Sequence, residues 1–228
     1  MAADPPTVRT RVRRLPERGA YDRETIDAIL DEALICHVGF VVDGQPYVIP
    51  TIHARLGDRL YLHGSTASRT LRTLATGAPV CVTATIVDGL VLARSVFHHS
   101  MNYRSAVVLG TARPVTDPEQ KLRGLQAVSD HIVRGRWDEV RQPNRQELNQ
   151  TALLCLELTE ASAKIRTGPP KDDPEDLDSP VWAGVLPLHL IPLSPAPDEG
   201  VPPDTPVPPN VRHWRKAIGN ERTLDGTD

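Results

Sequence analysis

The chain has 228 residues and a formal net charge of −3, which is enough for one domain with a sizeable core and a tail. So small a net charge excludes a nucleic-acid binder that works through bulk positive charge. No apolar run reaches the ~18 residues that a membrane helix needs, and the N-terminus lacks the apolar segment of a secretory signal. We therefore expect a cytoplasmic protein that binds neither nucleic acid nor membrane.

Charge and proline content divide the chain into segments. Residues 1–23 contain six arginines, and 13 of the 22 prolines lie between Pro169 and Pro209. Proline donates no backbone hydrogen bond and favours extended structure. We predict a basic N-terminal arm (1–20), a folded domain (21–168), an extended arm outside the sheet that packs on the domain or on a partner (169–193), and a loose tail (194–228). The three cysteines lie far apart in apolar runs, which predicts buried thiols.

The first half of the domain predicts a helix, a strand meander and a second helix. Apolar residues at helical spacing follow a capping Asp22, which predicts a helix over 22–33. Residues 34–63 read as three antiparallel strands, because the separators 43–45 and 56–58 are short turns. A helix over 66–77 would bury Leu71 and Leu74 and stop at Gly77.

The second half predicts four more strands and one helix. Strands over 78–87 and 90–97 are joined at Asp88-Gly89, the strongest hairpin signal in the chain. A strand over 103–115, a helix over 118–134 and a strand over 152–165 follow. Seven short, mostly antiparallel strands with few helices predict a mainly β (α+β) closed barrel. Several strands are apolar on both faces and need covering, which predicts a homodimer.

The segment 63–71, HGSTASRTL, has the composition of an anion site. Small hydroxyl residues and Arg69 stand where a strand gives way to a helix, so hydroxyls, backbone N–H groups and a guanidinium would meet. The alternative is an ordinary helix start capped by Ser65 or Thr66. Pro46 and Pro50 lie in one predicted strand, which places Pro50 at an edge or a bulge.

The segment 93–115 carries adjacent histidines followed by polar residues. His98 and His99 would point to opposite faces of a strand, and no Asp, Glu or Cys is spaced with them as a zinc site requires, so no metal site is predicted. Further along, one face would carry Asn102 and Arg104, and the other Tyr103 and Ser105. Either face could line the edge of a pocket.

Taken together, these segments resemble a known family. The runs DGQPYVIPTIHARLGDRLYLHGSTASRTLRTL, RSVFHHSMNYRSAVVLGTA, SAKIRTGPP and VWAGVLPL are similar to the pyridoxamine 5'-phosphate oxidase-like superfamily, and within it to the flavin-nucleotide-binding branch related to nitroimidazole-resistance proteins. The resemblance covers residues 15–193 and implies a six- to seven-stranded antiparallel split β-barrel. It also implies a homodimer with FMN in clefts at the dimer interface.

The resemblance also implies roles for individual residues. Ser68 and Arg69 would hold the FMN phosphate, with donors from Ser65 and Thr66. The backbone around Ile49, Pro50 and Thr51 would lie along the flavin ring, which Asn102, Tyr103, Arg104 and Ser105 would approach from a neighbouring strand. His63 matches a histidine that lies beside the flavin in the nitroimidazole-resistance branch. The chain ends in VRHWRKAIGNERTLDGTD where a pyridoxamine-phosphate oxidase typically has Arg-Leu-Ala-Pro, so vitamin B6 oxidation is not expected.

The sequence thus predicts an FMN-dependent oxidoreductase that acts on a small molecule. Its candidate proton donors are His63, His98, His99 and Tyr103, because a reduced flavin that passes hydride needs a nearby acid or base. Two alternatives remain. One is a non-catalytic flavin carrier or sensor. The other is a haem-binding or haem-degrading split barrel, which the adjacent histidines favour; deazaflavin F420 could also replace FMN.

Overall fold

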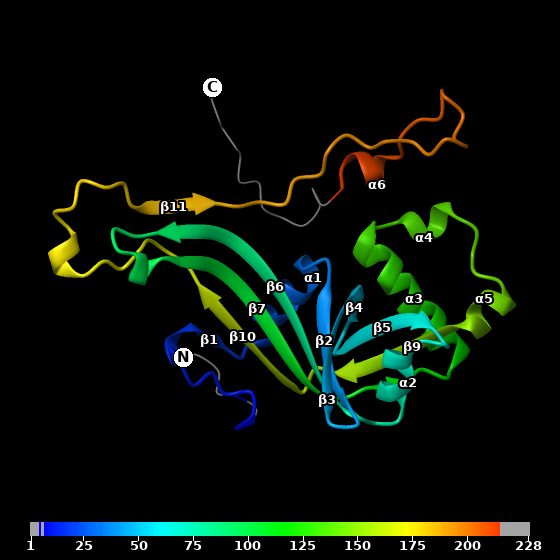
Figure 1. Ribbon diagram of the computed structural model, residues 1–228. Helices are drawn as coiled ribbons and strands as arrows, with labels where there is room; N and C mark the ends of the chain where they lie inside the picture. The colour runs from blue at the N-terminus through cyan, green and yellow to red at the C-terminus, as the bar shows by residue number, and fades with distance from the viewer. Residues whose placement is uncertain (1–4, 6, 215–228) are drawn as a thin grey trace.

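The computed structural model describes residue 5 and residues 7–214. Residues 1–4 and 6 of the predicted basic arm and residues 215–228 of the predicted tail lie outside the described part. The described strands form two antiparallel sheets (Figure 1). The first contains, in spatial order, β1 (Gly19–Ala20), β10 (Glu160–Arg166), β7 (Ser100–Thr111), β6 (Pro79–Leu92), β2 (Cys36–Val42) and β3 (Gln45–Thr51), with β11 (Gly184–Pro187) paired to β6. The second contains β4 (His53–Leu56), β5 (Arg59–Ser65), β9 (Thr151–Glu157) and β8 (Arg113–Pro114).

The helices surround the two sheets. The α-helices are α1 (Arg23–Glu32), α2 (Arg69–Ala75), α3 (Pro118–Ile132), α4 (Arg136–Glu139), α5 (Arg145–Gln150) and α6 (Pro209–Arg212), and the short 3-10 helices are η1 (Pro16–Arg18), η2 (Val96–His98) and η3 (Pro174–Asp176). The predicted helices over 22–33, 66–77 and 118–134 correspond to α1, α2 and α3. Among the described residues, no helix is long and apolar enough to cross a bilayer.

The chain passes directly from a strand of one sheet to a strand of the other at three places, one of which is Ala112, between β7 and β8. At Ile52 it leaves β3 in the first sheet and enters β4 in the second, and at 158–159 it returns from β9 to β10. The sequence prediction missed all three breaks: it gave three strands over 34–63 where there are four, and one strand each over 103–115 and 152–165 where there are two. The runs over 34–63 and 152–165 stay apolar through the break, because a strand that changes sheets remains in contact with the same core.

The main core lies between the two sheets beneath α1. Side chains from α1, β2, β5 and β9 that are less than 3% exposed include Ile26, Ile29, Leu30, Val38, Leu60, Leu62, Leu154 and Leu156. A second cluster of Ala54, Tyr61, Val128 and Leu153 joins the other face of the β4–β5–β9 sheet to α3. Cys36 is buried, Cys81 and Cys155 are half-buried, and all three are free thiols.

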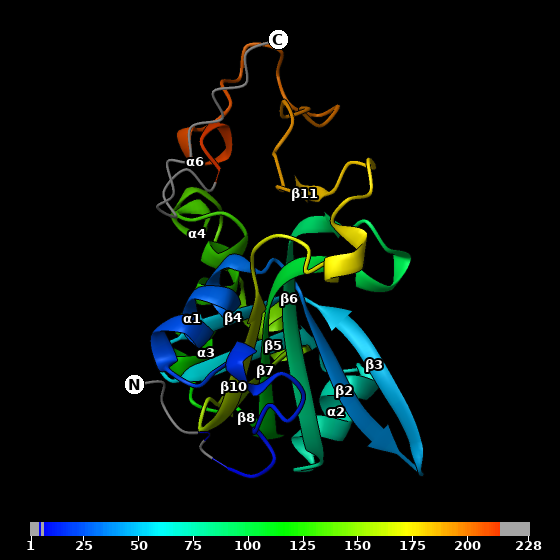
Figure 2. The ribbon, with the colours of Figure 1, turned by 90° about the vertical axis from the view of Figure 1, so that its left-hand side faces the viewer.

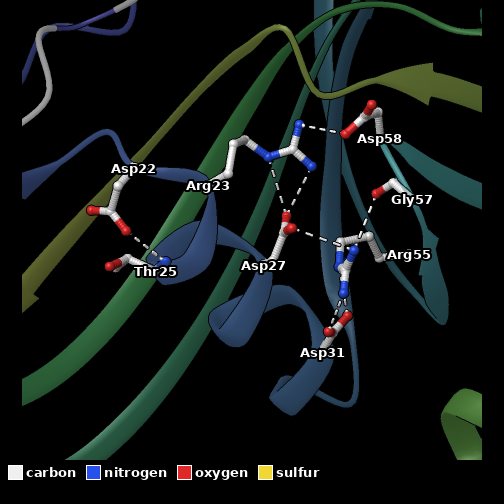
Figure 3. Close-up of polar contacts among 8 residues, drawn as sticks. All are labelled: Asp22, Arg23, Thr25, Asp27, Asp31, Arg55, Gly57 and Asp58. Carbon is white, nitrogen blue, oxygen red and sulfur yellow. Dashed lines mark hydrogen bonds and ion pairs between the residues drawn. The ribbon is translucent and has the colours of Figure 1, made fainter.

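An ion-pair network holds α1 against β4 (Figure 3). Asp22 caps the helix by accepting a 2.8 Å hydrogen bond from the Thr25 N–H. Arg55 on β4 binds Asp31 at 2.5 Å and reaches Asp27 at 3.4 Å, and Arg23 pairs with the same Asp27 at 3.0 Å. The predicted N-terminal cap is confirmed, and the network fixes the helix over the open side of the barrel.

The predicted hairpin at Asp88-Gly89 is wrong. Strand β6 runs without interruption from Pro79 to Leu92, and the register with β7 shifts by one residue at Asp88, which is a β-bulge. The chain reverses later, through η2 (Figure 1). Gly89 does not adopt the positive φ that an Asp-Gly hairpin turn needs. A glycine is needed at this position because a Cβ there would lie 2.9 Å from the Leu186 carbonyl oxygen of β11.

The C-terminal segment differs from its prediction in one respect. Residues 169–193 were expected to lie outside the sheet, but β11 pairs with the far end of β6, from Gly184↔Leu92 to Pro187↔Gly89. Beyond β11, residues 188–206 are exposed throughout, until α6 and Trp214, whose indole N–H donates to the Ile132 carbonyl at 2.6 Å. Pro187, the one proline of β11, is compatible with strand pairing because β11 is an edge strand.

Candidate functional site

The turn between β5 and α2 (residues 65–69) is held by its own hydroxyl groups. The Ser65 Oγ accepts from the Ala67 N–H at 3.1 Å, and the Ser68 Oγ caps α2 by accepting from the Leu71 N–H at 3.4 Å. The capping residue is therefore Ser68, and the prediction of Ser65 or Thr66 as the cap is wrong. The Thr66 N–H donates to the Gln150 carbonyl at 2.9 Å, which ties the turn to the end of α5. Each serine oxygen acts here as an acceptor, so its own O–H remains free to donate.

Strand β3 lies directly beside this turn. The Arg69 guanidinium stacks on the Tyr47 ring at 4.2 Å from the ring centroid, and Tyr47 in turn stacks on Phe40 at 5.7 Å. Tyr47, Ile49 and Thr51 alternate along β3 and share its core-facing side, because they pair with the buried Phe40, Val38 and Cys36. The structure therefore joins the turn to β3 through Tyr47, near the start of the strand, and the predicted residues Ile49, Pro50 and Thr51 lie two to four residues further along it. Pro50 belongs to β3, which is an edge strand of the first sheet, as predicted (Figure 2). It alternates with Ile49 and Thr51 and pairs with the exposed His37, so it lies on the outer face.

The cations of the turn are not neutralised by carboxylates. Within residues 5 and 7–214, no acidic side chain forms an ion pair with Arg69 or Arg72, although twelve such pairs occur elsewhere. Arg69 touches only the ring of Tyr47, and Arg72 donates to the Ala67 carbonyl. Two uncompensated guanidinium groups beside free hydroxyl donors form a region that attracts an anion.

His63 precedes the turn by two residues and is half-buried on β5. It lies opposite Leu153 of β9, and its Nδ1 is a buried atom without a hydrogen-bond partner in the described structure. Burial lowers the pKa of this imidazole below its usual range. His63 is therefore neutral at pH 7, and a neutral imidazole can both donate and accept a proton.

The second predicted group, residues 102–105 on β7, lies elsewhere. Pro50 of β3 is aligned with His37, Thr83 and Val107 across successive strands, so three strand spacings, about 14 Å, separate β3 from β7. Tyr103 and Ser105 alternate with the buried Ala106 and Val108 and face outward, opposite to the side that Tyr47 and Ile49 occupy. One copy of the chain does not bring these two groups together.

The inward-facing members of this second group have other partners. Arg104 donates two hydrogen bonds to the Glu32 carboxylate of α1 and two to the Asp88 carboxylate of the bulge. These bonds raise the pKa of its guanidinium. Asn102 is 8% exposed; it accepts from the buried Arg166 and donates to the Gly168 carbonyl at 3.2 Å. Both side chains connect β7 to neighbouring elements.

His98 and His99 lie in the η2 turn and its end, not on a strand. The His98 Nε2 lies 3.0 Å from the Asp173 Oδ2, and this hydrogen bond raises the pKa of His98. The His99 Nδ1 accepts from the Ala93 N–H at 3.2 Å, so the proton of its neutral ring is on Nε2. Among the described residues there is no group of three or more His, Cys, Asp or Glu side chains that could hold a metal ion.

Two hollows in the described part of the molecule can be compared with the predicted site. The larger, about 430 Å³, is lined by Asp58, Arg59, Tyr61, Arg123 and other residues, and it includes none of the predicted site residues. Its charges are largely paired, since Arg59 binds Glu157 at 2.9 Å and Asp58 binds Arg23 at 3.2 Å. The smaller, about 240 Å³, adjoins the turn at Thr66 and Arg72.

Comparison with known proteins agrees with this architecture. Residues 22–165 match the family model described as pyridoxamine 5'-phosphate oxidase. The chain belongs to this family. No protein with curated annotation matches the sequence significantly.

Among solved structures, the chain is 40% identical to a flavocytochrome, Anf3, from Azotobacter vinelandii, with a TM-score of 0.88 over 93% of this chain and 99% of that one. It is also 40% identical to an FAD and haem binding protein from Mycobacterium smegmatis, with a TM-score of 0.82 over 86% and 96% of the two chains. A protein from Bacteroides thetaiotaomicron described as a 5-nitroimidazole antibiotic resistance protein shares the fold at 23% identity, with a TM-score of 0.55 over 64% and 86% of the two chains.

Sequence reasoning missed Tyr47 and Lys121 as neighbours of the turn. Tyr47 is visible in the sequence only as a strand aromatic, and its stacking on Arg69 depends on the packing of β3 against α2. Lys121 lines the smaller cavity from α3, about 50 residues from the turn. No local pattern reports such a contact, because it depends on how the helices pack on the second sheet.

Proposed function

We propose that this chain binds a flavin nucleotide at the β5–α2 turn and uses it as an oxidoreductase on a small molecule. The observation that carries the proposal is the uncompensated pair Arg69 and Arg72 next to free serine hydroxyls, beside the core-facing side of β3. The flavin phosphate would accept from Arg69 and from the Ser65 and Ser68 hydroxyls. Membership of the family and the flavocytochrome and FAD-binding relatives support the binding of a flavin.

The residues of the turn have a defined task in this function. A bound flavin supplies hydride or electron transfer, and the protein supplies orientation and charge. Arg69 would fix the phosphate end, while its stacking on Tyr47 limits the guanidinium to one orientation. His63, which is neutral and half-buried, would exchange a proton with the substrate.

We further propose that the flavin lies between two copies of the chain. Tyr103 and Ser105 lie on the side of the first sheet opposite to Tyr47 and Arg69, so they and the turn contact one ligand only if Tyr103 and Ser105 come from a partner. The outer face near β3 also exposes Val41 (55%) and Val48 (64%), apolar surface that a second copy would cover. Light scattering should give twice the monomer mass, and a stable monomer that binds flavin would contradict this arrangement.

The test of the flavin site compares ligands with and without a phosphate. The apoprotein is titrated with FMN and riboflavin while flavin fluorescence is followed. Replacing Arg69 with Ala should weaken FMN by about tenfold or more and leave riboflavin nearly unchanged, because a charge-assisted hydrogen bond is worth roughly 1.5–3 kcal/mol. Equal losses for the two ligands would show that Arg69 does not hold the phosphate. A chain that binds flavin but shows no turnover with reduced nicotinamide and candidate acceptors is a carrier or sensor.

A second candidate function pairs the flavin with haem. It is favoured by 40% identity to both a flavocytochrome and an FAD and haem binding protein over most of the chain. The sequence has no C-x-x-C-H motif, so haem would be held without thioether bonds. His98 fits an iron ligand better than His99, because Asp173 holds one of its ring nitrogens in the way that carboxylates orient metal-binding histidines.

Haem titration tests this candidate. A sharp Soret band should appear, and it should be lost in His98→Ala and shifted in Asp173→Asn, while His99→Ala serves as the neighbouring control. A Soret band unchanged in all three variants would exclude η2 as the ligand segment. Titration with F420 in parallel shows whether the deazaflavin replaces FMN.

A further inference from the structure

The outer end of the β6–β7 ribbon exposes a large apolar surface. We define the tip as η2 together with residues 173–182, which are joined to each other by the contact between His98 and Asp173. The tip extends away from the two sheets (Figure 1). Within it, Phe97 is 87% exposed and Trp182 is 67% exposed. The other exposed apolar side chains of the tip are Val96, Leu177 and Val181.

The size of this surface indicates that a partner covers it. An aromatic side chain buries about 150–250 Å² in a core, so Phe97 and Trp182 alone expose roughly 300 Å². The two rings lie near one another, because Trp182 packs against Gly184, which pairs with Leu92 shortly before η2. The largest apolar patch of a typical monomer measures about 300–600 Å² in all and is often a binding site. The tip reaches this size once its three aliphatic residues are included.

Carboxylates stand among the apolar residues of the tip. Asp173 pairs with His98 at 3.0 Å, but Glu175 and Asp178 are exposed and form no ion pair in the described structure. Burial of apolar surface gives an interface its affinity, and complementary charge selects the partner. A segment with apolar side chains among positive charges therefore matches the tip.

The N-terminal arm of this chain, residues 7–18, has that composition. Arg11, Arg13 and Arg14 are exposed, and none of them forms an ion pair within residues 5 and 7–214. Val8 is 75% exposed, and Leu15 is also exposed. The arm thus complements the tip both in charge and in apolar surface.

The arm and the tip lie apart in one copy of the chain. Lys164 of β10 donates to the Arg14 carbonyl at 3.1 Å, and Lys164 is paired in register with Ser105 of β7. The tip begins beyond Ser100, five residues from Ser105 along β7, which at 3.4 Å per residue is about 17 Å. No ion pair of the described structure joins the arm to the tip. A contact between them therefore needs two copies.

We propose that the tip docks on the N-terminal arm of a second copy of this chain, while the arm of the first copy receives the tip of the second. A two-fold axis that crosses the ribbon between its ends exchanges those ends, so both contacts form at once. The inference rests on the two-copy arrangement proposed above, which needs the same exchange. Arg69 contacts Tyr47 at the level of the start of β6, whereas Tyr103 lies opposite Val87, towards the other end of that strand.

Charge reversal in the full-length chain tests the docking. One variant carries Arg13→Glu and Arg14→Glu in the arm, and the other carries Glu175→Lys and Asp178→Lys in the tip. Each alone should dimerise about tenfold or more weakly than the wild type in a dilution series at low salt, followed by sedimentation velocity, because like charges meet in both contacts. An equimolar mixture should recover the wild-type affinity within about threefold, because an acidic arm then meets a basic tip and a basic arm an acidic one. A mixture that recovers nothing would show that arm and tip do not meet across copies.

The apolar part of the contact is tested with Phe97→Ser. Leu56→Ser, at an exposed apolar position of β4, is the matched control. Phe97→Ser should weaken the dimer by about tenfold or more, as expected for the loss of a buried aromatic side chain, and Leu56→Ser should leave it within about twofold. Dimers unchanged in every variant would overturn the docking and leave the flavin arrangement standing. A wild-type chain that stays monomeric would overturn both, and the FMN titration described above would still test the turn.

Discussion

Acid should destabilise the folded chain through His53, because this histidine is buried in its neutral form. His53 has no exposed surface; its Nε2–H donates to the Leu30 carbonyl at 2.8 Å, and its Nδ1 has no partner in the described structure. Burial, together with the His131 ring at 4.8 Å, lowers the pKa of His53 from 6.5 to about 4, against smaller opposing effects of the hydrogen bond to the Leu30 carbonyl and of Asp31. Between pH 6.5 and about pH 4, His53 is therefore protonated in the unfolded chain and neutral in the folded chain.

The size of the effect follows from the two pKa values. The contribution of His53 to stability is complete above pH 6.5 and is lost as the pH falls from 6.5 towards 4. At about 1.4 kcal/mol for each tenfold difference in proton affinity, the total loss is about 3 kcal/mol. This is a large fraction of the 5–15 kcal/mol that is typical of domains, so the unfolding midpoint should shift visibly.

Urea unfolding followed by far-UV circular dichroism, repeated at several pH values from 7.5 to 4.5, measures this loss. His53→Gln places a non-titrating N–H donor near the Leu30 carbonyl and should flatten the pH dependence below pH 6.5, although the variant is less stable at pH 7.5. His189→Gln, at an exposed position of the C-terminal arm, is the control and should keep the wild-type pH dependence. If His53→Gln and the wild type lose stability in parallel as the pH falls, the neutral state of His53 is not the cause.

Three further predictions concern the β6–β7 ribbon and its contacts. Gly89→Ala should lower stability by about 1–3 kcal/mol in thermal denaturation, because the new Cβ meets the Leu186 carbonyl at 2.9 Å, whereas Gly200→Ala, whose Cβ would meet only the Asp198 carboxylate at an ordinary contact distance of 3.6 Å, should be neutral. Asn102→Ala should cost about 1–3 kcal/mol even without flavin, since it deprives the buried Arg166 of an acceptor; an effect on flavin affinity alone would instead make Asn102 a ligand contact. The pKa of His98, measured by NMR, should lie above 6.5 and fall in Asp173→Asn; a value independent of Asp173 would contradict the hydrogen bond between them.

Local patterns in the sequence predicted most of the elements. Asp22 and the spacing of Ile26, Ile29 and Leu30 define α1, and the Asp43-Gly44 turn has the positive φ values, 50° and 80°, of a tight hairpin. The same dipeptide at Asp88-Gly89 forms a bulge instead. The difference is tertiary: Asp88 pairs with Arg104, and β11 approaches Gly89 so closely that β6 continues through it. A dipeptide signal cannot report either contact.

The candidate site was predictable in composition but not in arrangement. The hydroxyl residues and Arg69 stand together in the sequence, so the turn between β5 and α2 could be predicted as a unit. The partners of Arg104 could not be predicted from the sequence, because its guanidinium contacts Glu32 and Asp88, which are 72 and 16 residues away. Residues 102–105 also alternate, so only a structure shows which two face the core and which two face outward.

The partners of a cation differ between the cations that hold helix α1 and those that lie near the proposed site. Arg55 and Arg104 contact carboxylates on α1 and hold that helix in place. Arg69, Arg72 and Lys121 contact only a ring or backbone carbonyls, and all three lie at or behind one turn. Unpaired cations gathered in one place repel one another, which costs stability unless an anion is bound. Arg113, Arg123 and Arg145 also lack an ion pair in the described structure, so a missing carboxylate alone does not mark a site. The grouping of Arg69 and Arg72 beside the Ser65 and Ser68 hydroxyls is what supports the anion site proposed above.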